Sequence, residues 1–488
     1  MRCQPVAEVE STVKRGTTVI EVLAQKVKQL PLFISCLLLA ACGGGGGSQG
    51  SNSGSGSGSV DPCSVAGQKE FVSETAESWY YWYDELADVN PDDYATAQAY
   101  LDALTAPLAA DSRDPGFSYL TTVEADEARF TSGTYYGFGF RYGFIGDDFY
   151  FADTFEGSPA FLAGLRRGQR LLAVDLNDGN GFETWESLAA REASSEEIFG
   201  STTEAVTRIF RIETASGTQD ISVTKDEIET PPLAGEPLLI ERDGLSPVGY
   251  LHFRSFIDSA DQPLRNAALT FAQAGVTDLV FDLRYNGGGL LRVAETVLNL
   301  FGGDIANGSA SYIIDFNDKH NDRDDTAYFS SIRETFTPLR IAFITRQGTA
   351  SASEMVINGL APHIEVVMIG DDTFGKAVGQ SAYDQGQGCD TRLRLISFEI
   401  QNGEGQGGYY TGLHDTGRFD LCEADDGLTR PFGDVNEASL STALAWFNGD
   451  VVCSAPIGAG AKQTVGLDDK WPINREPPLN RDGGVRSF

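Results

Sequence analysis

Three structural signals follow one another in the stretch Val276-Thr277-Asp278-Leu279-Val280-Phe281-Asp282-Leu283-Arg284-Tyr285-Asn286-Gly287-Gly288-Gly289-Leu290-Leu291. Its first half, residues 276–283, is a short apolar run of the kind found in strands that are buried on both faces. The three glycines end this run, and a helical pattern over residues 290–301 begins directly after them. A strand, a tight turn and a helix in this order make up one unit of an α/β fold.

The same alternation continues on both sides of this stretch, so we expect an α/β domain over residues 227–455. Its further elements are a strand over 248–253, a helix over 264–274 that Gly275 closes, a strand over 339–344, a helix over 353–360 and a strand over 364–369.

Composition narrows the classes of protein that fit. The chain has 488 residues, of which 41% are hydrophobic, and this is enough for two or three domains with their own cores. Its net charge of -34 repels phosphate backbones, which argues against a nucleic-acid partner.

The first 60 residues read as a leader and a tether. Residues 30–42 are apolar, too short to cross a bilayer as a helix, and preceded by two lysines, which is typical of an export signal. The sequence Leu39-Ala40-Ala41-Cys42 resembles a bacterial lipobox, in which the cysteine takes a lipid; an ordinary cleaved signal peptide is the alternative. We expect a lipoprotein signal peptide over 1–42, a Gly/Ser linker over 43–60 and a lipid anchor in the cell envelope, with the protein on the outer membrane facing the periplasm.

Four cysteines remain beyond the leader, at positions 63, 389, 422 and 453. An even number in an oxidising compartment favours disulfides, and no spacing of Cys or His residues indicates a metal site. Three pairings are possible. We expect Cys389 to pair with Cys422 and Cys63 with Cys453.

Residues 61–128 predict a small N-terminal helical domain. A helical pattern covers Phe71–Leu86, and Asn90-Pro91-Asp92-Asp93 has the composition of a helix start before Tyr94–Leu104. The aromatic run Trp79-Tyr80-Tyr81-Trp82-Tyr83 fits a core better than a ligand cage. Beyond the α/β domain, residues 456–488 are expected to form a C-terminal tail.

Residues 129–226 change to short alternating strands such as Phe149–Ala152 and Arg170–Val174. Gly137-Phe138-Gly139-Phe140 resembles the carboxylate-binding loop of a PDZ domain, and the stretch from Gly157 to Val174 follows the pattern of that family. Glycines let successive backbone amides turn toward a terminal carboxylate, while a strand edge takes the peptide. The resemblance implies a mostly β PDZ domain that binds apolar C-termini of proteins or peptides.

Two more motifs carry chemistry. Thr349-Ala350-Ser351-Ala352-Ser353-Glu354 follows the strand expected over 339–344, and Thr373-Phe374-Gly375-Lys376 is followed by Gln380. With the glycine turn and the PDZ-like module, they resemble the carboxyl-terminal processing (tail-specific) serine proteases over residues 70–450. That family has a crotonase-like core. Gly287 departs from the family pattern, because proline is frequent at this position.

The resemblance implies that Ser351 is the nucleophile, Lys376 the general base and Gln380 the residue that orients the lysine amine. A lysine can act in this way only when burial keeps its amine neutral. If residues 376–380 are helical, the two side chains lie on one face. The amides of Ala352 and Gly288 would form the oxyanion hole, with Gly289 as the alternative to Gly288.

Other interpretations of these residues stay open at this point. Ser351 and Glu354 also fit a helix capping box, and Ser353 is a competing nucleophile. A non-catalytic PDZ scaffold or a carrier of apolar ligands on the same core are alternative functions. The four histidines lie in no serine-protease context, and the pattern implies neither a cofactor nor a metal.

Overall fold

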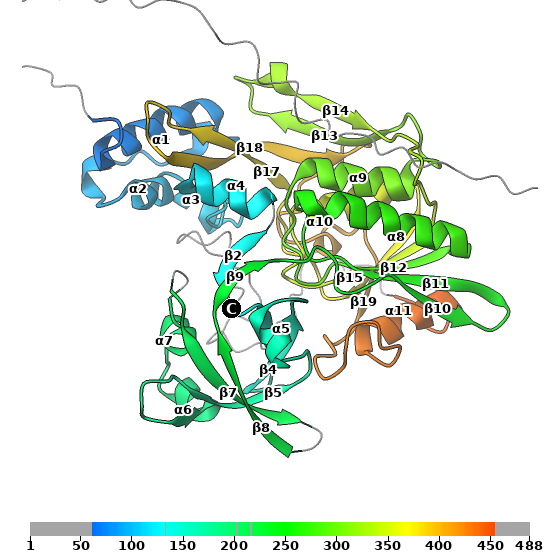
Figure 1. Ribbon diagram of the computed structural model, residues 1–488. Helices are drawn as coiled ribbons and strands as arrows, with labels where there is room; N and C mark the ends of the chain where they lie inside the picture. Colours follow the sequence, from blue (N-terminus) through cyan, green and yellow to red (C-terminus); the bar gives the residue numbers. More distant parts are fainter. Residues whose placement is uncertain (1–60, 132, 202–203, 215–216, 454–488) are drawn as a thin grey trace, which may run out of the picture. The chain divides into compact units, whose positions relative to one another are not determined.

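A computed structural model describes residues 61–131, 133–201, 204–214 and 217–453 of the chain. At its centre is a six-stranded sheet in the order β10-β11-β12-β15-β16-β19 (Figure 1). β10 and β11 are antiparallel, and the other neighbours are parallel. The strands are β10 Leu238–Arg242, β11 Leu245–His252, β12 Asp278–Asp282, β15 Arg340–Thr345, β16 Glu365–Gly370 and β19 Leu421–Glu423.

Helices cover both faces of this sheet. α8, α9 and α10 lie together on one face, and α11 lies on the other (Figure 1). Along β12, Leu279 and Phe281 pack in the core with α8, α9 and α10, and Val280 packs in the core with α11. Successive residues of the strand therefore point to opposite faces of the sheet. This two-sided burial explains the continuous apolar runs of the sequence and confirms the expected α/β fold. The helices are α8 Asp261–Ala274, α9 Leu291–Gly302, α10 Ala352–Leu360 and α11 Ala438–Asn448.

A second, antiparallel sheet has the order β1-β18-β13-β14, with β17 also paired to β18. Its strands are β1 Tyr119–Thr122, β13 Ala310–Phe316, β14 Asp325–Tyr328, β17 Val378–Asp384 and β18 Thr391–Asn402. The N-terminal helices share one core with β17 and β18, so a late segment of the chain completes the packing of an early one. These helices are α1 Val65–Trp79, α2 Ala97–Leu104 and α3 Ala106–Ala110; a fourth helix, α4 Val123–Thr131, follows β1.

Three helix boundaries in this region were predicted wrongly, since the first helix already begins at Val65, before Phe71. The first helix ends at Trp79, because the backbone of Tyr80 is extended, and Tyr80 is fully buried while its aromatic neighbours pack around it. Asn90 caps only a single 3-10 turn, Pro91–Asp93. The next helix begins after Thr96, whose hydroxyl accepts a hydrogen bond from the Ala99 amide.

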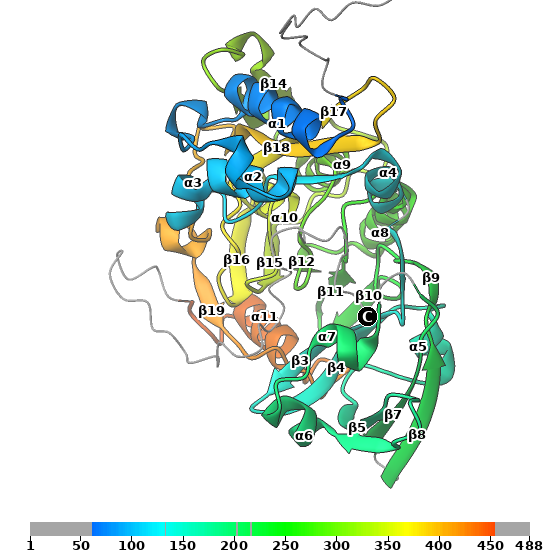
Figure 2. The ribbon, with the colours of Figure 1, turned by 90° about the vertical axis from the view of Figure 1, so that its left-hand side faces the viewer.

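Residues 134–229 form a third group of strands with a core of its own, drawn below the parallel sheet in Figure 2. Its main sheet has the order β3-β4-β5-β7-β8, with β6 paired to β5, while β2 pairs with β9. The strands are β2 Thr134–Gly137, β3 Phe140–Ile145, β4 Asp148–Thr154, β5 Arg170–Asp175, β6 Phe182–Thr184, β7 Thr207–Thr214, β8 Gly217–Thr224 and β9 Asp226–Glu229. Short helices are α5 Pro159–Ala163, α6 Trp185–Ala190 and α7 Ser195–Phe199.

The expected disulfide pairing was wrong. Cys63 pairs with Cys389 and Cys422 with Cys453, with Cα atoms 5.3 Å and 4.6 Å apart. Cys63 precedes α1, which packs against β18, and Cys389 lies in the turn that leads into β18. Cys422 lies in β19, and Cys453 follows α11, which packs on the same side of the parallel sheet.

Part of the sequence lies outside this description. The expected signal peptide, the lipidated Cys42, the linker and the tail over 456–488 all fall on residues that the structure does not describe. Within the described ranges, no helix has both the length and the apolar character needed to span a bilayer.

Candidate active site

Ser351 stands at a sharp turn between β15 and α10. Its backbone has φ of 55° and ψ of -115°, an unusual conformation for a residue with a side chain. Two contacts tie this turn to the end of β12: the Thr349 hydroxyl donates to the Leu283 carbonyl at 2.9 Å, and the Ala350 amide donates to the Asn286 carbonyl at 3.2 Å. The serine is partly exposed.

Ser353, the competing nucleophile, is placed differently. It has no exposed surface, and its hydroxyl donates to the Asn286 carbonyl at 2.9 Å. A substrate therefore has no access to this hydroxyl, and its role in the fold is to hold α10 against the glycine turn.

The Lys376 side chain is buried, with 6% of its surface exposed. Its amine donates to the Gln380 side-chain oxygen at 3.1 Å. Burial lowers the pKa of Lys376 to about 7, and the nearby carboxylate of Asp114 opposes this shift only in part. The amine is therefore neutral in a substantial fraction of molecules at neutral pH.

The segment that holds this pair is not helical, so the condition under which the two side chains would share a helix face is not met. Lys376 lies in the loop before β17, and Gln380 is a strand residue. The register of β17 against β18 shifts between Gly379 and Gln380. Because Lys376 precedes the strand and the register is irregular next to Gln380, a regular strand period does not account for their contact.

Glu354 links the serine turn to the lysine loop. Its carboxylate has no exposed surface and accepts hydrogen bonds from the amides of Ser351 at 2.8 Å, Gly375 at 2.7 Å and Lys376 at 2.9 Å. The first contact is half of the capping box expected from the sequence. The other two contacts reach a loop more than twenty residues away, so Glu354 sets the distance between the two motifs. Burial raises the pKa of this carboxyl to about 7.

Although Glu354 joins the serine motif to the lysine motif, no hydrogen bond joins the Ser351 hydroxyl to the Lys376 amine among the described residues.

The candidate oxyanion site is also incomplete in this conformation. The Ala352 amide, at the first position of α10, has no acceptor in the described part of the chain, whereas the Gly288 amide donates to the Asn286 side chain at 3.0 Å.

Of the two candidate glycines, Gly288 is the one beside the serine. A methyl group at Gly288 would come within 2.8 Å of the Ala352 nitrogen and 2.9 Å of the Ser351 Cβ. A methyl group at Gly289 would instead meet the Phe256 carbonyl. Both glycines have positive φ, which a side chain rarely tolerates.

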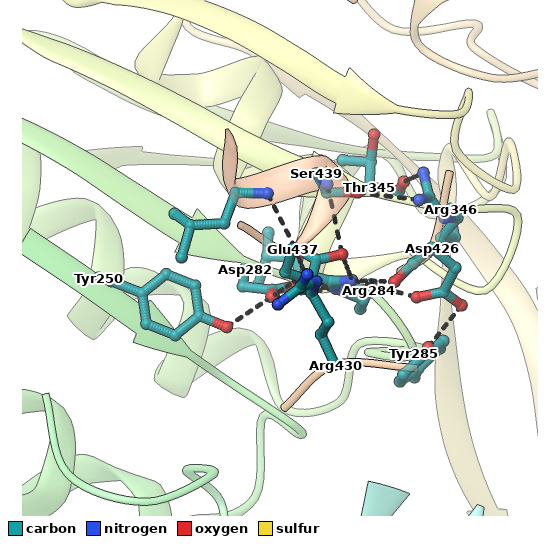
Figure 3. Close-up of polar contacts among 12 residues, drawn as sticks. Tyr250, Asp282, Arg284, Tyr285, Thr345, Arg346, Asp426, Arg430, Glu437 and Ser439 are labelled. Atoms are coloured by element: carbon teal, nitrogen blue, oxygen red, sulfur yellow. Dashed lines mark hydrogen bonds and ion pairs between the residues drawn. The ribbon is translucent and has the colours of Figure 1, made fainter. Parts of the chain in front are cut away.

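The Asp-Leu-Arg sequence at the end of β12 has a structural role (Figure 3). Arg284 is fully buried, and its guanidinium donates to the carboxylates of Asp282, Asp426 and Glu437. Tyr285, whose hydroxyl donates to Asp426, leads directly into the glycine turn. The network therefore fixes the chain just before Gly288.

The loop Gly137-Phe138-Gly139-Phe140 runs from β2 into β3. The rings of Phe138 and Phe140 are buried in the core of the third group of strands. The Ala160 amide donates to the Phe138 carbonyl and the Phe155 amide to the Gly139 carbonyl, both at 2.9 Å. The amides of Phe138 and Gly139 have no acceptor among the described residues, and both residues are buried.

Sequence reasoning missed three residues of this site. Glu354 was visible only as a possible cap, since nothing in its spacing indicates contact with the lysine loop. Asn286 and Phe117, whose carbonyl accepts from the Gln380 amide, carry no recognisable signal.

Comparison with known proteins supports a family assignment. The sequence model of "Peptidase family S41" matches residues 247–409, and that of "Peptidase S41 N-terminal domain" matches residues 67–119. The carboxyl-terminal-processing protease of Synechocystis is 27% identical over 246 residues, which cover 50% of this chain and 53% of the relative. The carboxy-terminal processing protease CtpA of Bacillus subtilis is 24% identical over 292 residues, covering 60% and 58%.

Among solved structures, an S41 protein of Bacteroides fragilis has a TM-score of 0.60 at 23% identity and covers 78% of this chain and 98% of its own. This likeness shows a shared fold. The chain spans about half the length of the first curated relatives that it matches. Together, these comparisons show that residues 67–119 and 247–409 match peptidase family S41 and that the homologues of this chain include carboxyl-terminal processing proteases.

Proposed function

We propose that this protein is a serine endopeptidase that uses Ser351 as nucleophile, Lys376 as general base and Gln380 to orient the lysine amine. The observation that carries the proposal is the buried amine of Lys376, which bonds to Gln380 and has a pKa near 7. A lipid carrier or a scaffold has no need for a desolvated lysine next to a strained serine turn.

In the proposed reaction, the neutral Lys376 amine takes the Ser351 proton while the serine oxygen attacks a peptide carbonyl. The Ala352 and Gly288 amides would hold the resulting oxyanion, and for this the substrate has to replace Asn286 at the Gly288 amide. The lysinium then protonates the leaving amine, which yields an acyl-enzyme and a neutral lysine. Water repeats the cycle on the ester and releases the acid.

The direct test is hydrolysis of an unstructured protein or a long peptide by the purified chain. Ser351→Ala and Lys376→Arg should each abolish cleavage, because a guanidinium stays charged and cannot accept a proton. Lys69→Arg is the matched control: this lysine is also buried, but its amine donates to the carbonyls of Pro91 and Tyr94. Full activity in Lys376→Arg would refute the proposed base.

Labelling with a serine-directed phosphonate distinguishes the peptidase from the non-catalytic alternatives. Mass spectrometry should find the adduct on Ser351, with none in Ser351→Ala. An adduct on Ser353 would assign the nucleophile to the other serine, and no adduct on an intact, folded chain would favour a scaffold or carrier.

We also propose that residues 134–229 are a PDZ-type module that binds the apolar C-termini of substrates. The amides of Phe138 and Gly139, which lack an acceptor among the described residues and precede β3, support this role. A fluorescent peptide with an apolar C-terminus should bind to the Ser351→Ala protein, and the same peptide with an amidated end should not. Equal binding of both peptides would argue against carboxylate recognition by this loop.

The expected leader suggests where the substrates are. We propose that the protein is anchored in the cell envelope through a lipid on Cys42 and cleaves exported proteins. Labelling of cells with a palmitate analogue should mark the wild-type protein and not Cys42→Ala. A label that persists in Cys42→Ala would exclude this anchor.

A further inference from the structure

The wall of the Lys376 pocket comes from the N-terminal part of the chain. Phe117 lies in the loop between α3 and β1, is 2% exposed, and has its ring centroid 4.5 Å from the Lys376 amine. Its carbonyl accepts a hydrogen bond from the side-chain amide of Gln380. The oxygen of the same Gln380 side chain accepts from the lysine. One residue therefore contacts both the amine and the group that orients it.

Buried hydrogen bonds hold this loop in place. Asp114, which has no exposed surface, accepts from the Phe117 amide at 2.6 Å, from the Ser118 hydroxyl at 2.7 Å and from the Tyr80 hydroxyl at 2.9 Å. The Ser118 hydroxyl also accepts from the Ile396 amide of β18 at 3.2 Å. The ring of Phe117 packs on Phe374 of the lysine motif, with centroids 5.6 Å apart. The loop cannot withdraw without leaving several of these groups unpaired.

Charges of both signs surround the amine. Asp114 and Glu354 favour its charged form, while Arg129 of α4 and Arg394 of β18 disfavour it. Burial is the largest effect on the pKa of Lys376 and lowers it. Attraction between an ammonium and a ring face acts in the opposite direction but is weaker than the loss of water. The ring therefore influences the lysine mainly as a cover.

We propose that Phe117 is a positioning residue for the reaction: its ring keeps water from the Lys376 amine, and its carbonyl fixes the Gln380 side chain. The N-terminal segment, which the S41 N-terminal family model matches over residues 67–119, thereby supplies part of the pocket around Lys376, the proposed general base. The role in catalysis rests on the proposed peptidase function, whereas the effect on the amine can be measured without it.

The kinetic test compares Phe117→Ser, Phe117→Leu and the wild-type protein. Serine admits water to the amine, so the acid limb of the kcat/KM profile should move up by about two pH units. Because about one amine in a hundred is then neutral at pH 7, compared with about one in two before, kcat/KM at pH 7 should fall about fiftyfold and recover as the pH approaches 9.5. Leucine keeps an apolar cover and should leave the limb near its wild-type position.

Leu108→Ala is the matched control. Leu108 is fully buried in the same core as Phe117, and no contact joins it to Lys376 among the described residues. Its truncation should lower stability and leave the acid limb unchanged. An acid limb that stays in place in Phe117→Ser, or moves equally in Leu108→Ala, would overturn the proposal.

A second readout does not depend on activity. In Ser351→Ala protein with 13C-labelled lysine, a signal that titrates near pH 7 should disappear in Lys376→Met, which distinguishes it from Lys225, whose pKa burial lowers to about 8. Adding Phe117→Ser should raise the pKa of this signal. An unchanged titration would refute the proposal that the Phe117 ring keeps water from the amine. If the signal shifts but the wild-type chain cleaves nothing, the proposed function fails while the influence of Phe117 on the amine stands.

Discussion

At the residue scale, the site contains a buried amine, a strained backbone and a buried carboxylate, each of which needs specific partners to be tolerated in the fold. Lys376 is a buried amine, Ser351 has a strained backbone, and Glu354 is a buried carboxylate. Such groups cluster at functional sites, because the surrounding structure can hold them there. Their removal should therefore change stability in directions that the local environment predicts.

Lys376→Met should stabilise the protein at low pH. Because burial lowers the pKa of Lys376 from 10.5 to about 7, the folded state binds fewer protons than the unfolded state between these values. The lysine therefore costs stability in full below pH 7, by up to about 5 kcal/mol, and this cost fades as the pH rises to 10.5. Urea denaturation at pH 6 and at pH 10.5 checks this, and an equal gain at both pH values would contradict it.

Glu354→Ala should destabilise the protein and abolish activity. The substitution leaves the amides of Ser351, Gly375 and Lys376 without their acceptor, at about 1 to 3 kcal/mol for each buried group. We expect the free energy of unfolding to fall by about 3 kcal/mol or more. Glu354→Gln keeps one acceptor oxygen and should lose less. A Glu354→Ala protein with wild-type stability would show that these contacts do not hold the two motifs together.

At the element scale, helices and strands far apart in sequence complete one another. α1 and β18 share a core, and the disulfide between Cys63 and Cys389 joins the ends of these elements. The disulfide between Cys422 and Cys453 fastens α11 to the edge of the parallel sheet in the same way. Each bridge therefore reinforces packing that is already present.

Replacing both cysteines of one bridge by serine should separate their contributions. Each bridge is expected to contribute about 2 to 4 kcal/mol, and the bridge from Cys63 to Cys389 should contribute more, because it closes a chain segment of 326 residues, compared with 31. Thermal unfolding of the two double variants measures the difference. A larger loss for the Cys422 and Cys453 pair would show that loop length does not dominate.

At the scale of the whole molecule, a buried ion pair joins the third group of strands to the parallel sheet. Arg254, two residues after β11, is 1% exposed and donates to both oxygens of Asp153 in β4, at 2.8 Å and 2.9 Å. The Phe256 amide, nearby in the chain, donates to the Gly288 carbonyl of the glycine turn. The junction between the two sheets and the candidate oxyanion site therefore share one short segment.

Asp153→Asn should loosen this junction, because it leaves the buried Arg254 guanidinium with Glu156 as its remaining carboxylate partner. The expected cost is about 1 to 3 kcal/mol. Hydrogen exchange should increase in β4 and over residues 253–256, while the N-terminal helices keep their protection. The double variant Asp153→Asn with Arg254→Met should recover part of the loss, and no recovery would argue against a direct pair.

The sequence alone determined the elements whose residues are buried by a regular pattern. β12, β15 and β16 appear as apolar runs because both of their faces are covered, and α8 ends at Gly275 because a glycine readily adopts the left-handed conformation found there. The roles proposed for Ser351 and Lys376 come from the resemblance of their short motifs to a protease family, and they stay predictions.

Only the tertiary structure decided how distant segments meet. The partner of each cysteine, the strand that holds Gln380, the link from Glu354 to the lysine loop and the cover that Phe117 provides all depend on contacts across tens to hundreds of residues. Local periodicity reports which face of an element is buried and not which segment buries it. The environment of the Lys376 amine is therefore a property of the fold, because segments that are remote in the chain exclude water from it.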